Sequence, residues 1–270
     1  MSTKIMLGLD VGTTGAKVIA FDLEGNILAS AYKEYGCTYP YPGWAQQDAD
    51  MLAKVSFSLV KEVTAKLKEN AKNICSIGFS TQRNAAIFLD KNGKALRMLT
   101  WQDSRSEKEV ALMKKKVSDS EHYFTTGLPL SENWYLPKIL WMEKNEPQLW
   151  EETERVVQLM EYLAKAFGAE DYYLPENDAN FTSCFNVATL SWQQDYIEKF
   201  GMAKKAMPKL CRTNTPVGKI APSVAKELGL PENLLLPVAL GDTAAATLGA
   251  GVVRKGDVSV SMGTGGRQPC

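Results

Sequence analysis

The sequence predicts a domain of the α/β class. Three short apolar runs follow one another at the start of the 270-residue chain, which is the pattern of three consecutive antiparallel strands. Segments with helical periodicity then alternate with further apolar runs along the rest of the chain. Together these strands and helices indicate an α/β domain. The three N-terminal runs span residues 4–9, 18–21 and 27–31.

Glycines separate these first strands. Gly12 and Gly15, in "DVGTTG", allow the backbone to take a positive φ and allow a ligand to approach closely. Gly25 and Asn26, in "DLEGN", predict a hairpin between the second and third strands.

Periodicity and turn signals predict the remaining elements. One helix is expected over residues 50–70, starting near Asp48 or Asp50, with one apolar face formed by Leu52, Val55, Leu59, Val63 and Leu67. After it we expect strands within 74–90 ending at the turn "KNGK", a helix over about 104–117, two helices over 136–168 broken near "NEPQLW", and short helices over 193–201 and 222–229. Near the C-terminus, "PVALGDTAAATLGAGVV" predicts a strand, a tight turn and a helix of small residues, and "GDVSVSMGTGG" predicts a strand and a Gly-Thr-Gly turn.

The "DVGTTG" turn has the composition of a phosphate-binding loop. Backbone N–H groups and the hydroxyls of Thr13 and Thr14 would form a concave set of donors, and Lys17 would add positive charge. Asp10 fits beside phosphates if hydrated Mg²⁺ lies between them, because Mg²⁺ keeps several waters and takes few carboxylates. A simple tight hairpin explains the same residues without any ligand.

The overall composition argues against several classes of protein. Lys plus Arg equals Asp plus Glu at 31 each, so neither a nucleic-acid surface nor an acidic tail is expected. No apolar run is long enough to cross a membrane, and "MSTK" leads directly into a strand without a signal peptide. The five cysteines are scattered without CxxC spacing, which predicts reduced thiols and a cytoplasmic protein. The single histidine, His122, is expected to be a solvated side chain, so a carboxylate is the better candidate for a general base.

The end of the chain echoes its beginning. Both "IMLGLDVGTTG" and "VSVSMGTGG" place an apolar strand before a turn rich in Gly and Thr. Two phosphate-binding turns facing each other across a cleft would explain the echo. Residues 254–270 are too few for a second domain, so we expect the chain to be part of a longer protein.

These motifs, in this order, resemble the FGGY carbohydrate kinase family of the sugar kinase, actin and Hsp70 superfamily. The matching segments are "DVGTTGAKVIAFD", "STQRNAAIFLD", "WQDSR", "ENDANFTSCFNVATLSW", "GDTAAATLGAG" and "SVSMGTGG". The resemblance implies a ribonuclease H-like (actin-like ATPase) domain with a mixed central sheet flanked by helices. It also implies that 1–253 form the N-terminal, substrate-binding lobe and that 254–270 begin a truncated C-terminal lobe.

The resemblance also implies an activity, the ATP-dependent phosphorylation of a hydroxyl on a small sugar, ketose or polyol. Asp242 would be the general base, and Asp10 would hold Mg²⁺ through water. Residues implied to contact the nucleotide phosphates are Gly12, Thr13, Thr14, Lys17, Gly263 and Thr264. Residues implied to line the substrate site are Gln82, Arg83, Asn84, Trp101 and Asp103. The part of the enzyme given by 1–270 would be inactive alone.

Other readings of these residues stay open. Asp242 could be only a helix N-cap, and Trp101 could be only packed in the core. Glycerol is an improbable substrate, since Asn84, Asn133 and Thr243 depart from the residues of glycerol kinases at those places. The Trp-x-Asp-x-Arg segment resembles pentulose kinases such as xylulose kinase, although a Met-His-Gly sequence typical of xylulose kinases is missing near Arg83. A non-catalytic sugar-binding module of the same fold is the alternative function, and a homodimer is compatible with either.

Overall fold

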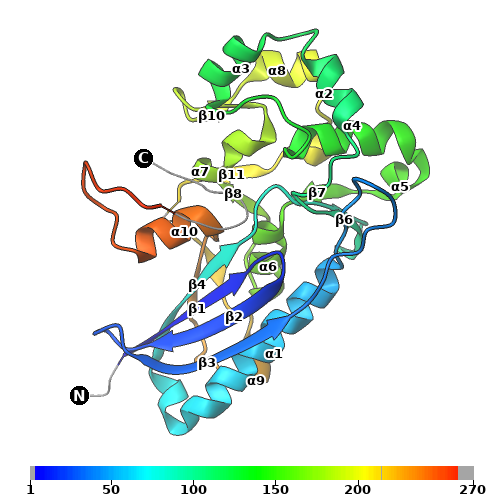
Figure 1. Cartoon of the computed structure of the whole chain (residues 1–270). Helices are drawn as coiled ribbons and strands as arrows, with labels where there is room; N and C mark the ends of the chain where they lie inside the picture. Colours follow the sequence, from blue (N-terminus) through cyan, green and yellow to red (C-terminus); the bar gives the residue numbers. More distant parts are fainter. Residues whose placement is uncertain (1–3, 214, 261–270) are drawn as a thin grey trace.

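The computed structural model describes residues 4–213 and 215–260. Its centre is a five-stranded mixed sheet in the order β14-β4-β1-β2-β3 (Figure 1). β1, β2 and β3 form the expected antiparallel meander, and β4 and β14 extend it in parallel. The strands span Ile5–Val11 (β1), Gly15–Phe21 (β2), Ile27–Glu34 (β3), Ile74–Thr81 (β4) and Leu240–Gly241 (β14).

Gly12 and Gly15 do not use the positive φ that glycine allows, since neither residue lies in the left-handed region. The turn closes because the Gly12 N–H donates to the Gly15 carbonyl at 3.0 Å. Gly15 is required for another reason, because a Cβ there would lie 2.7 Å from the hydroxyl oxygen of Tyr32. Gly25 does have a φ of 87° in the expected hairpin, which Asp22 supports by accepting from the Asn26 N–H.

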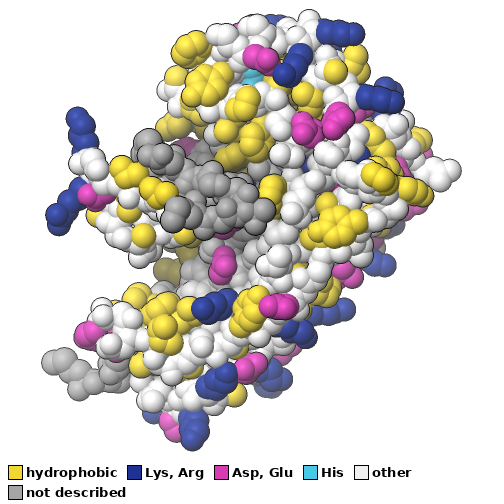
Figure 2. Space-filling model, viewed as in Figure 1, with side chains coloured by type: hydrophobic (Ala, Val, Ile, Leu, Met, Phe, Trp, Pro, Cys, Tyr) yellow, Lys and Arg dark blue, Asp and Glu magenta, His cyan; other side chains and the backbone are white. Residues whose placement is uncertain are grey.

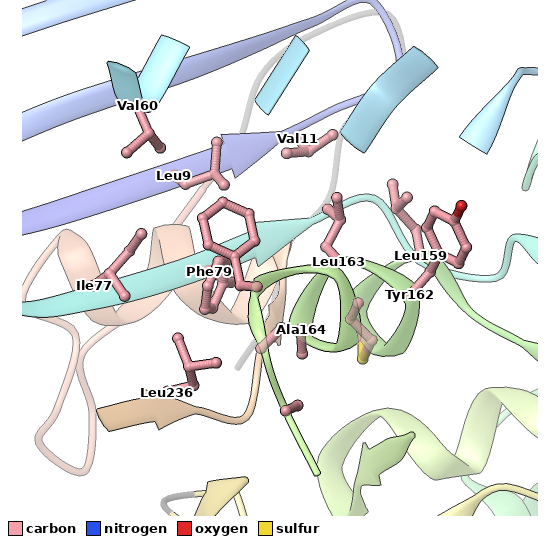
Figure 3. Packing of buried hydrophobic residues seen from close by; sticks show 14 of the residues in the cluster. Leu9, Val11, Val60, Ile77, Phe79, Leu159, Tyr162, Leu163, Ala164 and Leu236 are labelled. Carbon is pink, nitrogen blue, oxygen red and sulfur yellow. The ribbon is translucent and has the colours of Figure 1, made fainter. Parts of the chain in front are cut away.

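One face of the sheet is covered by helices. α1 (Ala49–Leu67) begins at the predicted cap, where the Asp48 carboxylate accepts from the Met51 N–H, and its predicted apolar face is buried. α6 (Leu159–Phe167) and α9 (Pro222–Leu228) complete the layer. Figure 3 shows side chains of β1, β4, α1, α6 and β13 (Leu235–Pro237) packed into this core; those labelled are Leu9, Val11, Val60, Ile77, Phe79, Leu159, Tyr162, Leu163, Ala164 and Leu236.

A second, three-stranded sheet in the order β6-β5-β7 divides two cores. β5 (Ala86–Leu89) is buried along its whole length, as its unbroken apolar sequence suggests. Ile87 packs into the core under the large sheet, whereas Phe88 packs into a second core formed with α2, α4 and α8. The partner strands are β6 (Ala95–Leu99) and β7 (Arg155–Val157), neither of which the sequence pattern predicted.

The second core is built from short helices, several of which differ from expectation. The two helices expected over 136–168 are present and broken near "NEPQLW" as predicted, but the break also holds a short helix and β7, which pairs with β5. The expected helix over 104–117 is shorter and is followed by another. The helices are α2 (Glu107–Met113), α3 (Asp119–Thr126), α4 (Tyr135–Asn145), α5 (Pro147–Glu152) and α8 (Gln194–Phe200), whereas α7 (Glu176–Ala179) buries Ala179 in the first core. Small strand pairs join β8 (Tyr173–Pro175) to β11 (Lys209–Cys211), β9 (Phe185–Asn186) to β10 (Ser191–Trp192), and β12 (Pro216–Lys219) to β13.

His122 is not solvated as predicted. It is fully buried on α3, its Nδ1 lies 2.8 Å from the Leu128 carbonyl oxygen, and its ring stacks on Tyr196. Burial lowers the pKa of its imidazole. The prediction failed because α3 turns its polar residues His122 and Thr126 inward and leaves Phe124 exposed, which reverses the usual pattern.

The C-terminal part differs from expectation in two ways. β14 passes directly into α10 (Asp242–Gly249), without the expected tight turn. The described part of the expected last strand, 256–260, is not a strand, and among the described residues no strand pairs with it. The Gly-Thr-Gly turn with Gly263 and Thr264 lies outside the described residues.

The surface carries charges of both signs. Figure 2 shows Lys and Arg interspersed with Asp and Glu over the face it presents. Of the described cysteines, Cys37, Cys75, Cys184 and Cys211 are free thiols. Within 4–213 and 215–260, no helix is both long and apolar enough to cross a membrane.

Candidate active site

The predicted site residues meet at one edge of the central sheet. β1, β4 and β14 are mutually parallel, so their carboxyl ends lie side by side. Asp10 pairs with Ser80 on the neighbouring strand, and Ser80 pairs in turn with Leu240. Arg83 follows the end of β4, and Asp242 follows the end of β14. The topology therefore brings together residues that are far apart in the sequence.

Asp242 is the first residue of α10, where the helix dipole favours a negative charge. Its Oδ1 accepts from the Thr243 N–H at 2.7 Å and from the Thr243 hydroxyl at 3.2 Å. The Arg83 Nε lies 3.7 Å from the same oxygen. The side chain of Asp242 is 47% exposed, so the carboxylate is accessible to a ligand.

Arg83 is held on three sides. Its Nη1 lies 3.4 Å from the Oδ1 of Asp178, a fully buried carboxylate, and its guanidinium lies 4.3 Å from the centre of the Phe181 ring. Asp242 is the third neighbour. Gly241 makes this packing possible, because a Cβ there would lie 2.1 Å from the Cδ of Arg83 and 2.7 Å from Asp178. Burial raises the pKa of Asp178, whereas Arg83 and the Gly241 N–H lower it.

These side chains border a cavity of about 360 Å³. Its walls combine three aromatic rings with amide, hydroxyl and charged groups, which is the composition of a site for a small polar molecule. The lining residues are Thr13, Arg83, Asn84, Trp101, Asn133, Trp134, Phe181 and Asp242. Four residues predicted for the site, Arg83, Asn84, Trp101 and Asp242, lie in this wall. Thr13, predicted to contact phosphate, lines it too.

The threonine turn is linked to the cavity wall by hydrogen bonds. The Thr13 hydroxyl donates to Gln82 Oε1 at 3.2 Å and accepts from Trp101 Nε1 at 2.8 Å. Gln82 is buried behind the wall and donates to Gln47 and to the Gly12 carbonyl. Since the Gly12 N–H is already bonded within the turn, it is not a free donor for phosphate. Gln82 thus supports the turn and does not line the cavity.

Asp103 also lies behind the wall. It is fully buried, its two oxygens accept from the guanidinium of Arg105 at 2.8 Å each, and its Oδ2 accepts from the Ala45 N–H. The guanidinium is in turn placed over the rings of Trp44 and Trp141. This pair fixes the loop that carries Trp101, whereas the sequence had suggested direct contact between Asp103 and substrate.

Asn84 has a left-handed backbone, with a φ of 62°. The buried ammonium of Lys138 holds it there by donating to the Asn84 carbonyl at 3.0 Å, and Gln158 accepts from the Asn84 N–H. Lys138 also donates to the carbonyl of Asn133 at 2.5 Å, so one buried lysine connects two segments of the cavity wall. Burial lowers its pKa to about 7.

Asp10 does not line this cavity and lies near the carboxyl end of β1, two strands from β14. Its Oδ1 accepts from the Ser80 hydroxyl at 2.6 Å, and it is paired across the meander with Lys17. Desolvation raises its pKa, and the charge of Asp242 raises it further. Asp10 is exposed, so its carboxylate could hold a hydrated divalent cation through the waters of the ion. Among the described residues, however, no group of three or more His, Cys, Asp or Glu could enclose a metal ion.

The profile of the FGGY family of carbohydrate kinases, N-terminal domain, matches residues 5–249. The chain belongs to this family. A xylulose kinase of Staphylococcus epidermidis is 28% identical over 267 residues, which cover 98% of this chain and 53% of that protein. A gluconokinase of Bacillus subtilis is 26% identical over 265 residues, covering 98% of this chain and 51% of that protein. The chain therefore spans about half the length of the curated relatives it matches.

Solved structures confirm the expected ribonuclease H-like architecture. A xylulose kinase from Brucella ovis superimposes with a TM-score of 0.89 at 28% identity, over 97% of this chain and 54% of that one. A xylulose kinase from Rhodospirillum rubrum gives a TM-score of 0.91 at 24% identity, over 97% and 54% of the two chains.

Several residues of this FGGY site were not predicted. Asp178 and Phe181 lie in "ENDANFTSCF", a segment that carried the resemblance without an assigned role. Trp134 precedes α4 in a polar stretch with no recognisable spacing, and Asn133 beside it was named only as a departure from glycerol kinases. Gly241 could have been found, since a glycine directly before a candidate catalytic aspartate is a sign of close packing.

Proposed function

We propose that this chain forms the sugar-binding half of an ATP-dependent carbohydrate kinase. The substrate would occupy the cavity of about 360 Å³, and one of its hydroxyls would be phosphorylated. The names of the relatives, xylulose kinase and gluconokinase, support a small sugar or sugar derivative as substrate. Those proteins are about twice as long as this chain. We therefore propose the ATP-dependent phosphorylation for a protein that contains this chain, and not for residues 1–270 alone.

The position of Asp242 carries this proposal. Its carboxylate stands in the cavity wall after the end of β14, and Asp10 lies near the end of β1, two strands away on the same sheet edge. A base beside the sugar and a second carboxylate beside the phosphate turn are what transfer to a sugar hydroxyl requires.

The surroundings of Asp242 suit a general base. The Thr243 N–H and hydroxyl both donate to Oδ1, which fixes the direction of the carboxylate. Asp242 would accept the proton of the substrate hydroxyl as the new O–P bond forms. Asn84 and Trp101 would orient the sugar, through an amide and through an aromatic wall beside its C–H groups.

Fewer of the residues predicted to contact the nucleotide phosphates are available for that role than the sequence suggested. Thr14, at the exposed tip of the turn, and Lys17, exposed beside Asp10, remain available for phosphate oxygens. Asp10 would hold Mg²⁺ through water, and the ion would neutralise phosphate charge when bound. Gly263 and Thr264 would contribute from the second turn. A cytoplasmic location and a homodimer stay parts of the proposal that rest on the sequence argument.

Asp242→Asn tests the proposal in a full-length protein that contains this chain. Phosphoryl transfer should fall by about 10²–10⁴-fold, the usual cost of removing a general base, while the sugar Kd changes by less than about tenfold. Initial rates with millimolar ATP and a sugar panel, together with calorimetry, measure both quantities.

Asp195→Asn is the matched control, because Asp195 pairs with Lys199 on the exposed surface of α8. It should leave turnover unchanged. Turnover by Asp242→Asn within a few-fold of wild type would contradict the assigned base. Sugar binding by a wild-type protein that never transfers phosphate would instead favour the non-catalytic binding module.

A further inference from the structure

The charge balance of the cavity bears on which sugars it accepts. Among the described residues that line it, Arg83 is the only cation and Asp242 the only anion. A sugar acid would need a cation whose charge is still available, and a bidentate arginine is the usual partner of a carboxylate. The relatives include enzymes for a neutral ketose and for gluconate, so the state of Arg83 distinguishes two substrate classes.

Arg83 is already neutralised. Asp178 lies 3.4 Å from Nη1, and Asp242 lies 3.7 Å from Nε, so carboxylates meet the guanidinium on two sides. Phe181 covers a face of the guanidinium, and only 14% of the side chain remains exposed. Asp178 in turn accepts from the Gly241 N–H and from Asn177, which hold it in place. A third carboxylate brought to this point would meet two others.

The uncharged groups of the cavity favour hydroxyls. Asn84 and Asn133 both line the cavity, and their uncharged side-chain amides can exchange hydrogen bonds with hydroxyl groups. Neither amide carries the positive charge that would compensate the charge of a carboxylate. Trp101, Trp134 and Phe181 provide apolar surface for the C–H groups of the same ligand.

We propose that the cavity selects a small neutral ketose or polyol and rejects sugar acids, because Asp178 and Asp242 together neutralise Arg83. This inference rests on the proposed function, since it assumes that the cavity holds the sugar. Asp178 is then a specificity-determining residue that acts through Arg83.

The sharpest test compares two ligands that differ only at one carbon. D-glucitol and D-gluconate share their hydroxyls, but the first carries CH₂OH where the second carries a carboxylate. Calorimetry on the 270-residue chain at neutral pH should show D-glucitol or D-xylulose binding at least about tenfold more tightly than D-gluconate, as like-charge contact predicts. Gluconate binding equal to or tighter than that of glucitol would overturn the inference and leave the proposed function standing. Binding of none of the three would reject both.

Asp178→Asn tests the assigned cause. The amide keeps the shape of the side chain but no longer neutralises the charge of Arg83. The ratio of the Kd of D-gluconate to the Kd of D-glucitol should therefore fall by about tenfold relative to the wild-type chain. Asp171→Asn is the control, because Asp171 pairs with Arg155 and Lys209 away from the cavity, and it should keep the wild-type ratio. An unchanged ratio in a folded Asp178→Asn protein would overturn the role of Asp178. If that variant does not fold, the comparison of the two ligands in the wild-type chain still decides the preference.

Discussion

Residues 4–99 and residues 100–182 differ in what they bury. In the first segment, strands and α1 bury apolar side chains, and Asp22 is the one buried charged residue among those described. The second segment buries a larger set of charged side chains, some of them directly behind the cavity wall: Asp103, Arg105, Glu109, Lys138, Glu161 and Asp178. Ordinary hydrophobic patterning therefore builds the sheet, whereas buried charges with fixed partners shape the cavity.

The contrast has a physical cause. A hydrophobic core is tolerant, because many apolar side chains of similar volume fill it. A buried charge is intolerant, since it is stable only with partners at defined positions. Lys138 illustrates the benefit, for it holds the carbonyls of Asn84 and Asn133 and so sets the distance between two walls.

Arg105→Met should have the largest effect. It leaves the buried carboxylate of Asp103 without its bidentate partner, which typically costs about 3–5 kcal/mol of unfolding free energy. Because the pair fixes the loop of Trp101, affinity for a neutral sugar should fall as well. Urea unfolding and calorimetry measure the two effects, and wild-type stability in this variant would show that the pair is dispensable.

Two further variants separate charge from packing. Leu52→Ala, in the core under the large sheet, should cost about 2–5 kcal/mol of unfolding free energy yet leave sugar affinity unchanged in the folded protein.

The double variant Asp103→Leu with Arg105→Met replaces both partners of the buried ion pair. It should recover most of the stability that Arg105→Met alone loses, because no unpaired charge remains. Sugar affinity should recover less, since the loop would no longer be fixed.

The same contrast explains which features the sequence could predict. The meander, α1 and its Asp48 cap follow from local patterns, and they were predicted correctly. Asp103 was expected to contact substrate and His122 to be solvated, but both side chains are buried. The burial of a polar side chain depends on partners far away in the sequence: Arg105, which pairs with Asp103, is held over the rings of Trp44 and Trp141. That Asp10, Arg83 and Asp242 lie close together could be predicted only from the family resemblance, because no single segment of the sequence determines the order of the strands in the sheet.

Lys138→Met should have an intermediate effect. Two buried carbonyls lose their donor, which costs about 1–3 kcal/mol, and the cavity should lose affinity for sugar. The difference in unfolding free energy between wild type and Lys138→Met should also depend on pH. Burial lowers the pKa of Lys138 to about 7 in the folded state, whereas the unfolded value is about 10.4, so between them the unfolded state binds more protons. Wild-type stability relative to Lys138→Met should therefore rise from pH 7 to pH 9.

Thermal or urea unfolding at several pH values checks this slope. Glu161, whose pKa burial raises to about 8, titrates in the same range, but it is present in both proteins and cancels in the difference. Parallel pH profiles for wild type and Lys138→Met would contradict the assigned environment of the lysine.

Gly25→Ala should have the smallest effect, and it probes the segment that lacks buried charge clusters. Gly25 has a φ of 87° and nothing within 4 Å of an added Cβ, so the substitution introduces backbone strain without a clash. A left-handed alanine costs roughly 1–2 kcal/mol. Gly36→Ala is the matched control, because that position is equally open but has no positive φ, and it should be neutral or slightly stabilising. Sugar affinity should be unchanged in both variants, since the hairpin at Gly25 lies at the opposite end of β2 from the cavity. A loss of affinity in Gly25→Ala would show that the meander does more than support the site.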